Sequence, residues 1–204
     1  WYKSIAENAY KPIATIEELS VKWNALGDDL EKKKKFIEEN KKAFDELGVA
    51  INGVTDAENL LIANKQAFID AQIEKAKASI YLAQAQEKIK EYIKAEQEYK
   101  AMPDKRSYYV QTSSFGTGYY VEGENTAKKE KKKELDELKA EITQGYTNAA
   151  AAEQSGLKKL KDAGIDATQT YAKGSLGASQ QAMQLKQEAL KHLTNNADYA
   201  KAMQ

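Results

Sequence analysis

The chain has 204 residues, and its 31 Lys and Arg residues balance its 31 Asp and Glu residues, which gives zero formal charge. This balance argues against a dedicated nucleic-acid or anionic-membrane surface, because both normally require an excess of basic residues. The chain contains no cysteine, which excludes disulfide scaffolds and thiolate metal sites. Only four Phe and two Trp residues are present, so we expect a thin core. No apolar run approaches the roughly 18 residues of a membrane span, and no signal peptide is visible.

The amino-terminal region, residues 1–54, is predicted to hold a helix and a connector. Pro12 predicts the end of a short helix over Tyr2–Tyr10, because proline lacks the N–H that a helix interior needs. From Thr15 to Leu47 the apolar residues alternate at steps of three and four, which is typical of one heptad helix. Gly27 lies beside this seam and should weaken the helix locally. The seam positions are Ile16, Leu19, Trp23, Leu26, Leu30, Lys33, Ile37, Asn40, Phe44 and Leu47.

A short apolar connector follows this helix. Gly48 is a good left-handed helix terminator, and Asn52-Gly53 is typical of a turn. The chain therefore reverses direction here, and large apolar residues on both sides should meet. The residues that we place at this main hydrophobic junction are Trp23, Phe44 and Phe68.

No proline or glycine interrupts residues 55–102, so we expect one long helix of about 45 residues. Thr55 and Glu58 are placed to form a capping box at its start, and Pro103 marks its end. The predicted seam runs through Leu61, Asn64, Phe68, Ala71, Lys75, Ala78, Leu82, Ala85, Ile89, Tyr92, Glu96 and Tyr99. Polar seam residues such as Lys75 and Glu96 commonly select the register of a helix pair.

The first half of the same helix carries a second apolar stripe. Its members are Ile62, Ile69, Ile73, Ala76, Ile80 and Ala83. Two apolar faces require two packing partners, because an exposed stripe of this length would be an association site. We expect the Ile16–Leu47 helix to cover the stripe, rather than another copy of the chain, because the connector between the two helices is short.

Residues 103–124 are predicted to form the tip of a helical hairpin. Tyr108-Tyr109-Val110 and Tyr119-Tyr120-Val121 flank a turn rich in Ser and Gly, which indicates a small β-hairpin or an ordered loop. Its aromatic residues are either a local mini-core, which we favour, or anchors for an interface. The aromatic residues concerned are Tyr108, Tyr109, Phe115, Tyr119 and Tyr120.

A third helix is expected to begin at Asn125-Thr126 and to end or bend at Gly164. Its seam begins with bulky residues and then shrinks to small ones, which permit close helix approach but bury less area. In order, the seam residues are Leu135, Leu138, Ile142, Gly145, Ala149, Ala152 and Gly156. Residues 168–178 are expected to be a looser joint, and a last helix to run from about Ser179.

The sequence therefore predicts an all-α fold: an elongated antiparallel helical hairpin or coiled-coil bundle with an aromatic loop or β-hairpin at its tip. The predicted domains are residues 1–54, the hairpin of residues 55–163, and a carboxyl-terminal helical segment of residues 164–204. The chain begins at Trp1 and ends inside a continuing helical pattern, so we expect it to be a piece of a longer polypeptide.

No pattern indicates catalysis. His192 is the only histidine, and it has no neighbouring acid to orient it as a base. The carboxylate pairs lie on adjacent helical positions, whose side chains diverge and do not converge on one ion or substrate. These pairs are Asp28-Asp29, Glu38-Glu39 and Asp45-Glu46. We predict no catalytic, cofactor-binding or metal-binding residue, no cofactor, and no enzyme.

Two further patterns have simple structural explanations. The Phe115-Gly116-Thr117-Gly118 segment lacks the following Lys-Ser/Thr of a phosphate-binding loop, so we interpret it as a turn. The lysine clusters at residues 32–35 and 128–133 have acids at three- and four-residue spacing, which favours a helix face of ion pairs over a nucleic-acid contact.

Residues 23–78 resemble a recurring segment of phage tail tape measure proteins of the prophage type. The matching residues are Trp23-Asn24, Phe36-Ile37, Phe44 to Gly48, Val54 to Asn59, Ala67 to Ile69 and Ala76 to Ala78. The resemblance implies a long, mostly helical structural protein in the lumen of the tail tube, whose length sets the length of the tail. The resemblance implies no active-site residue at these positions.

The resemblance also implies partners and a location. The partners would be the tail tube, tail chaperones and copies of the protein itself, with no small-molecule substrate, no specific nucleic acid and no membrane bound by this segment. The protein would lie in the host cytoplasm before assembly and in the virion tail afterwards. The alternative is a coiled-coil spacer or assembly domain of another complex, such as an adhesin stalk or a secretion component.

Overall fold

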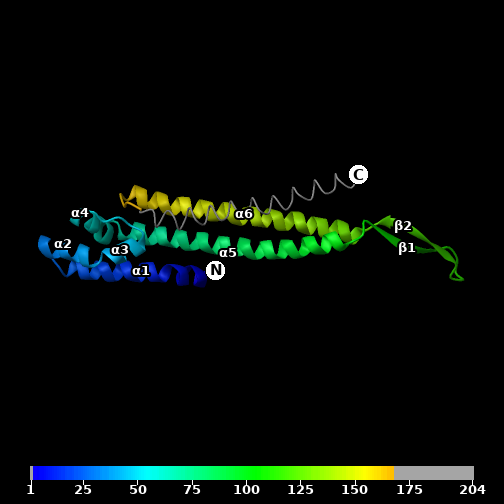
Figure 1. Cartoon of the computed structure of the whole chain (residues 1–204), viewed down its shortest axis with the longest axis horizontal. Helices are drawn as coiled ribbons and strands as arrows, with labels where there is room; N and C mark the ends of the chain where they lie inside the picture. Colours follow the sequence, from blue (N-terminus) through cyan, green and yellow to red (C-terminus); the bar gives the residue numbers. More distant parts are fainter. Residues whose placement is uncertain (1, 168–204) are drawn as a thin grey trace. The chain divides into compact units, whose positions relative to one another are not determined.

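A computed structural model describes residues 2–167 of the chain, and these are mostly helical with one small antiparallel sheet (Figure 1). The joint predicted at residues 168–178, the helix predicted from Ser179, and His192 lie outside the described residues. The chain forms two compact units. One comprises the described residues of Trp1–Leu82 and Tyr146–Gln204, and the other comprises Ala83–Gly145.

Helix α1 (Tyr2–Asn24) runs through Pro12, so the predicted helix end at Tyr10 is wrong. A proline inside a helix costs about 3 kcal/mol, because it removes one hydrogen bond and crowds the preceding turn. Ile16, Leu19 and Trp23 are all buried, and each contributes roughly 1.5–3 kcal/mol by leaving water. Burial of the apolar face beyond Pro12 therefore outweighs the local penalty.

The predicted single helix from Thr15 to Leu47 is also wrong, because the chain folds into three helices there. After α1 come α2 (Leu30–Glu39) and α3 (Lys41–Leu47). Gly27 adopts a left-handed conformation with φ of 58°, which turns the chain, and Asp29 caps α2 by accepting a hydrogen bond from the Lys32 N–H. The heptad pattern arose from three short helices that each direct one apolar face toward a shared core.

The main core collects large side chains from both ends of the described chain. Trp23, Phe44 and Phe68 are each at most 2% exposed and belong to one cluster with Val49, which confirms the predicted junction beside the connector. The other fully packed members of the cluster are Ile16, Leu19, Phe36, Leu47, Ala57, Leu60, Leu61, Ala71, Leu160 and Ile165. Gly48 ends α3 in the left-handed conformation, with φ of 78°, as predicted.

The long helix predicted from Thr55 is interrupted. It consists of α4 (Val54–Glu58), a π-helical turn η1 (Asn59–Ala63), and α5 (Lys65–Ala101). The capping-box prediction is wrong, because the helix begins at Val54 and Gly53 precedes it without a side-chain cap. The Asp56 carboxylate instead accepts a hydrogen bond from the Asn52 N–H at 2.9 Å.

Hydrogen bonds between η1 and distant parts of the same unit stabilise this turn. The Ser20 hydroxyl donates a buried hydrogen bond to the Leu61 carbonyl at 2.9 Å. The Asn59 amide donates to the carbonyls of Ala163 and Gly164 at 3.1 and 3.2 Å. A π-turn leaves backbone groups without their ordinary helical partners, and the Ser20 hydroxyl satisfies one of them, while Asn59 joins the turn to the end of α6.

Helix α6 (Thr126–Asp162) follows the sheet and ends before Gly164, whose φ is 64°, as the sequence predicts. Within the first unit, its small residues Ala149 and Ala152 pack on Ala78 of α5. The seam lysine, Lys75, faces the carboxylate of the buried Glu153, and burial lowers the pKa of Lys75 although that carboxylate opposes the change.

The second unit has a smaller core. Ala95 of α5 packs on Leu135 and Leu138 of α6, with Tyr92 and Tyr99 partly buried against them. Ion pairs cross between the two helices at Lys88–Glu141 (3.1 Å) and Lys131–Glu98 (2.8 Å).

The second apolar stripe, which begins at Ile62 in η1 and continues along α5, is only partly covered. Ile69 packs on the main core, to which α1 and α3 also contribute, and Ala76 is buried. Ile73 and Ile80 are half-buried, and Ile62 remains 41% exposed. The stripe's complete partner therefore stays a prediction.

Candidate functional site: an exposed aromatic β-hairpin

The tip segment is a β-hairpin, as predicted. Strands β1 (Lys105–Gln111) and β2 (Gly118–Glu124) pair antiparallel. Tyr108 lies opposite Val121, and Tyr109 opposite Tyr120. The predicted turn is confirmed too: the Thr112 N–H donates to the Thr117 carbonyl at 2.7 Å, and Gly116 adopts a φ of 80°.

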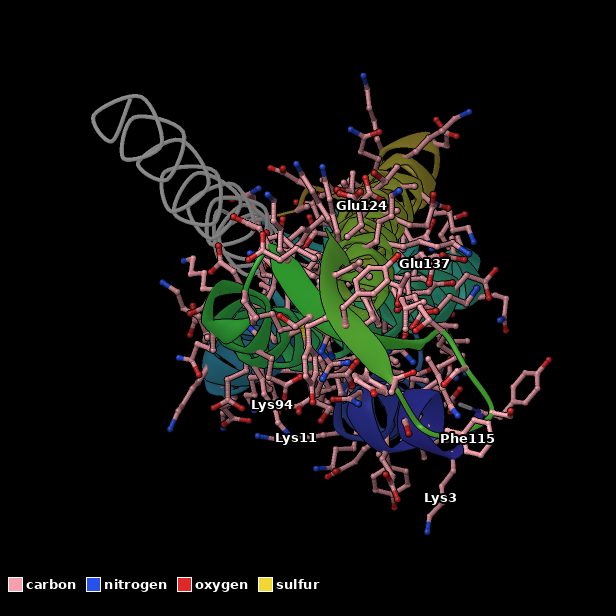
Figure 2. The ribbon with its side chains drawn as sticks, turned by 90° about the vertical axis from the view of Figure 1, so that its right-hand side faces the viewer. Lys3, Lys11, Lys94, Phe115, Glu124 and Glu137 are labelled. Carbon is pink, nitrogen blue, oxygen red and sulfur yellow. The ribbon has the colours of Figure 1, made fainter. Side chains whose placement is uncertain are left out.

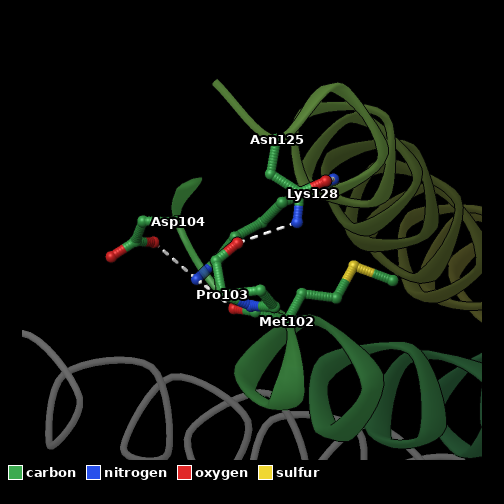
Figure 3. Close-up of polar contacts among 5 residues, drawn as sticks. All are labelled: Met102, Pro103, Asp104, Asn125 and Lys128. Carbon is green, nitrogen blue, oxygen red and sulfur yellow. Dashed lines mark hydrogen bonds and ion pairs between the residues drawn. The ribbon is translucent and has the colours of Figure 1, made fainter. Parts of the chain in front are cut away.

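The base of the hairpin is fixed to the helix ends by a small polar network (Figure 3). The Asn125 amide donates to the Pro103 carbonyl at 2.8 Å, and its oxygen caps α6 by accepting from the Lys128 N–H at 3.3 Å. The Lys128 ammonium donates to the Met102 carbonyl at 2.8 Å and to the Asp104 carboxylate at 2.6 Å. The hydrogen bond from Lys128 lowers the pKa of Asp104. The strands are therefore attached to α5 and α6 at a defined junction.

The aromatic side chains of the hairpin remain largely in solvent. Phe115 on the turn is 95% exposed and extends away from the strands (Figure 2). Tyr119 and Tyr120 are 57% and 73% exposed. Tyr109 and Tyr120 do form an edge-to-face pair with ring centroids 5.2 Å apart. The favoured mini-core interpretation thus holds for one ring pair, while most of the aromatic surface is open.

Hydrogen bonds keep two of these rings in place. The Tyr108 hydroxyl donates to the Glu124 carbonyl, and the Tyr109 hydroxyl to the Gly116 carbonyl, both at 2.7 Å. Gly118 leaves room for its cross-strand neighbours, since a Cβ there would lie 2.7 Å from a ring carbon of Tyr109. The rings are therefore oriented before any partner binds, which lowers the entropy cost of binding through them.

The side chains alternate between the two faces of the hairpin. One face carries Tyr108, Val110, Tyr119 and Val121, with Arg106 toward the base, and the other carries the Tyr109–Tyr120 pair with the Lys105–Glu122 ion pair. Exposed tyrosines beside one or two charges are the composition of protein-binding surfaces.

The carboxylates considered in the sequence do not converge on a site. Asp29 caps α2, while Glu38 and Glu39 are exposed on that helix and Asp45 and Glu46 are exposed on α3. Within residues 2–167, no group of three or more His, Cys, Asp or Glu side chains is placed to hold a metal ion. None of the helices in this part of the chain combines the length and the apolar character that a membrane crossing requires.

The lysine clusters form the predicted ion pairs. Lys34 pairs with Glu31 at 2.8 Å, and Lys35 with Glu39 at 3.6 Å. In the second cluster, Lys131 pairs with Glu134 at 2.8 Å. Each of these three lysines therefore has a carboxylate beside it on its own helix.

The sequence did not anticipate one polar cluster in the core. Lys33 lies 5.0 Å from the centroid of the Trp23 ring and donates to the Glu58 carboxylate at 3.0 Å. The Trp23 indole N–H donates to the same carboxylate oxygen at 2.7 Å. These two hydrogen bonds lower the pKa of Glu58, with that from Trp23 the larger cause. The available signal was Lys33 itself, a charged residue at a seam position.

No protein-family profile, no curated protein and no solved structure matches this chain.

Proposed function

We propose that this chain is a structural, non-enzymatic segment of a phage tail tape measure protein, which occupies the tail tube and helps to set the length of the tail. The proposal rests on the resemblance of residues 23–78 to that family. It is supported by the burial of its bulky residues, since Trp23, Phe36, Phe44 and Phe68 pack in one core. The residues that carry the resemblance therefore include core residues, on which the shape of a structural segment depends.

We also propose that α5 and α6 form an elongated antiparallel hairpin of the coiled-coil type. Support comes from each unit separately: Ala78 meets Ala149 and Ala152 in one, and Ala95 meets Leu135 and Leu138 in the other. Small-angle scattering tests this proposal. We expect a radius of gyration well above the roughly 17 Å of a compact domain of this length, and a value near 17 Å would contradict it.

The proposed partners are the tail tube, the tail chaperones and further copies of the same protein. We propose that the protein is in the host cytoplasm before assembly and in the tube lumen afterwards. The zero formal charge and the internally paired lysine clusters support protein partners over nucleic acid.

Tail length is the decisive measurement. In the parent prophage, an in-frame deletion of α5, the β-hairpin and α6 removes two helices of 37 residues each. At about 1.5 Å per residue the tail should shorten by roughly 110 Å if both helices lie end to end, and by about half of that if they remain folded on each other. Electron microscopy of induced particles measures the change. Tails of unaltered length would contradict the proposal.

The second candidate is a coiled-coil spacer or assembly domain of an adhesin stalk or secretion component. The exposed aromatic hairpin favours it, because such a domain needs a binding surface at a helix end. Replacing residues 105–124 by a short Gly/Ser turn separates the two candidates. A length-setting segment should change tail length by no more than the span of residues 105–124, whereas an adhesin or secretion component should lose attachment or export.

A further inference from the structure

The two edges of the β-hairpin are open, and the pairing pattern identifies their free backbone groups. In an antiparallel pair, hydrogen-bonded and non-hydrogen-bonded residue pairs alternate. The Thr112–Thr117 and Asp104–Asn125 hydrogen bonds fix the phase of that alternation at both ends. The N–H and C=O groups that point outward from β1 therefore belong to Lys105, Ser107, Tyr109 and Gln111, and those from β2 to Gly118, Tyr120, Glu122 and Glu124. The Glu124 carbonyl is not free, because it accepts the hydrogen bond from the Tyr108 hydroxyl.

An isolated two-stranded hairpin is marginal in water, and proteins usually protect an open edge with charges, prolines, bulges or a covering element. Strands β1 and β2 form a two-stranded sheet in the described chain, and every residue of β1 is exposed. The central part of β1, from Ser107 to Gln111, has neither charge nor proline. This edge lacks the usual protection.

The two edges differ in charge. The outward-facing residues of β2 include Glu122 and Glu124, which are held by Lys105 at 3.5 Å and by Lys129 of α6 at 2.7 Å. Gly118, at the far end of β2, contributes no side chain to a new pair. A strand added to β2 would have to accommodate these ion pairs, whereas one added to β1 meets Ser, Tyr and Gln along most of its length.

We propose that β1 pairs antiparallel with β1 of a second copy of this chain, on a two-fold axis through Tyr108, to give a four-stranded sheet. The proposal rests on the proposed function in that it treats the hairpin as an assembly element. The register that aligns all seven residues of β1 pairs Ser107 with Tyr109 and Lys105 with Gln111 of the second copy. The outward-facing residues of both strands then meet each other, as backbone hydrogen bonding requires.

This register is compatible with charge and with space. Arg106 lies opposite Val110 of the second copy, so no like charges are opposed. Within the second unit, the strands project beyond the ends of α5 and α6 (Figure 1). Antiparallel pairing places the helices of the two copies at opposite ends of the joint sheet.

The same two-fold axis joins the apolar faces of the two hairpins into one. The two-fold axis runs perpendicular to the sheet, so both copies present the same face on the same side. This face carries Tyr108, Val110, Tyr119 and Val121. Pairing through one strand buries less than the roughly 1,200 Å² of a stable interface, so the contact should be weak in dilute solution. It gains strength where several copies are held in one assembly.

Single-cysteine variants of the full chain test the pairing cleanly, because the natural sequence has no cysteine. Tyr108→Cys places two thiols across a non-hydrogen-bonded pair with Cα atoms about 4.5 Å apart, within the range that a disulfide spans. Val121→Cys is the matched control, since it lies directly opposite Tyr108 on the same face. Val110→Cys is a second control, because its two thiols would be about 14 Å apart along the strands.

Under mild oxidation, Tyr108→Cys should form covalent dimers roughly tenfold or more faster than either control, because pairing raises the effective concentration of the thiols. Equal rates for all three variants, with far-UV circular dichroism unchanged, would overturn the proposal by indicating random collision. A fastest reaction at Val121→Cys would indicate pairing through the β2 edge, and a fastest reaction at Val110→Cys would indicate face-to-face stacking. Either result would also overturn the proposal.

Because Tyr108→Cys also removes the Tyr108–Glu124 hydrogen bond, a second pair of variants tests the pairing with Tyr108 in place. Mixing Ser107→Cys with Tyr109→Cys should give mainly the mixed disulfide, because these positions face each other across the axis. Ser107→Pro removes an outward-facing N–H while leaving the bonds within the hairpin, so it should abolish the concentration-dependent dimer in sedimentation, whereas Ser107→Ala keeps it. A mixture with no excess of mixed disulfide, or dimers that persist in Ser107→Pro, would overturn β1 pairing.

Failure of β1 pairing and failure of the proposed function give different results. If tail length responds to deletion of the helices but the cysteine variants do not cross-link, the chain is a length-setting segment whose β1 edge is not a self-pairing surface. If cross-linking succeeds and tail length does not change, the pairing belongs to a different assembly.

Discussion

The two units of the chain hold themselves together in different ways. The unit of Trp1–Leu82 and Tyr146–Gln204 buries Trp23, Phe44 and Phe68 at 2% exposure or less, together with many aliphatic side chains. The unit of Ala83–Gly145 has Ala95, Leu135 and Leu138 as its core cluster, supported by tyrosines and ion pairs. Because apolar burial supplies about 25 cal/mol per Å², the first unit should carry most of the stability and the second should be the easier one to open.

The largest expected effect is in the main core. Phe68→Ala or Phe44→Ala should lower the free energy of unfolding by about 3–5 kcal/mol, since each removes a fully buried ring and leaves a cavity. Urea denaturation measures the change. Leu30→Ala is the control, because Leu30 is 61% exposed and should change stability by less than about 0.5 kcal/mol. A loss under about 0.5 kcal/mol for both phenylalanines would mean that the core does not control unfolding.

Truncation of a buried leucine to alanine in the second unit tests the comparison directly. Leu138→Ala should cost about 2 kcal/mol, at the low end for a leucine, because Leu138 is 8% exposed and its small cluster can relax around the gap. Hydrogen exchange should show the effect at amides of residues 83–145 while those near Phe68 keep their protection. Equal loss of protection in both units would show that they unfold together and that the distinction has no energetic meaning.

A smaller effect is expected at the π-helical turn. Ser20→Ala removes the hydroxyl that satisfies the buried Leu61 carbonyl and should cost about 1–3 kcal/mol, the penalty of one unsatisfied buried group. Thr15→Ala is the matched control on α1, because the Thr15 hydroxyl donates to the Lys11 carbonyl on the exposed side of the same helix. Equal effects of the two substitutions would argue that the long-range hydrogen bond does not hold the turn.

The comparison also explains which elements the sequence could predict. In the second unit, local chemistry decides: the aromatic strands, the Ser/Gly turn and the Asn125 start of α6 are all where propensity places them. In the first unit, packing overrides local preference. Helix α1 continues through Pro12 because the burial of its far half outweighs the helix-breaking preference of proline, and local propensity does not include that burial.

The heptad pattern also shows the limit of prediction from local sequence. Spacing identified the buried residues correctly in most cases but not the number of helices that carry them, because three short helices can satisfy the spacing of one. The Ser20 and Asn59 hydrogen bonds to η1 join residues 41 and about 104 positions apart, which spacing within one segment cannot reveal. The exposure of the hairpin was likewise not predictable, since composition alone does not say whether rings cover each other.

The smallest effect is a pH dependence at the Trp23–Glu58–Lys33 cluster. The indole N–H of Trp23, and then the Lys33 ammonium, hold the pKa of Glu58 below its ordinary value of 4.5 in the folded chain. The unfolded state therefore binds a proton more readily than the folded state. The stabilisation is complete above pH 4.5 and disappears as the pH falls through the lower folded value. Because the Glu58 side chain is 46% exposed, solvent screening keeps the contribution small.

Urea midpoints across this range measure the contribution. Wild-type stability should fall more steeply below pH 4.5 than that of Glu58→Gln, whereas Glu38→Gln on the exposed face of α2 should follow the wild type. In a Trp1→Phe background Trp23 is the only tryptophan, so its fluorescence reports protonation of the carboxylate that its indole contacts. If Glu58→Gln and the wild type lose stability in parallel while the fluorescence stays constant, the cluster is a packing feature whose charge is not coupled to folding, and the acid sensitivity of the main core must come from carboxylates elsewhere.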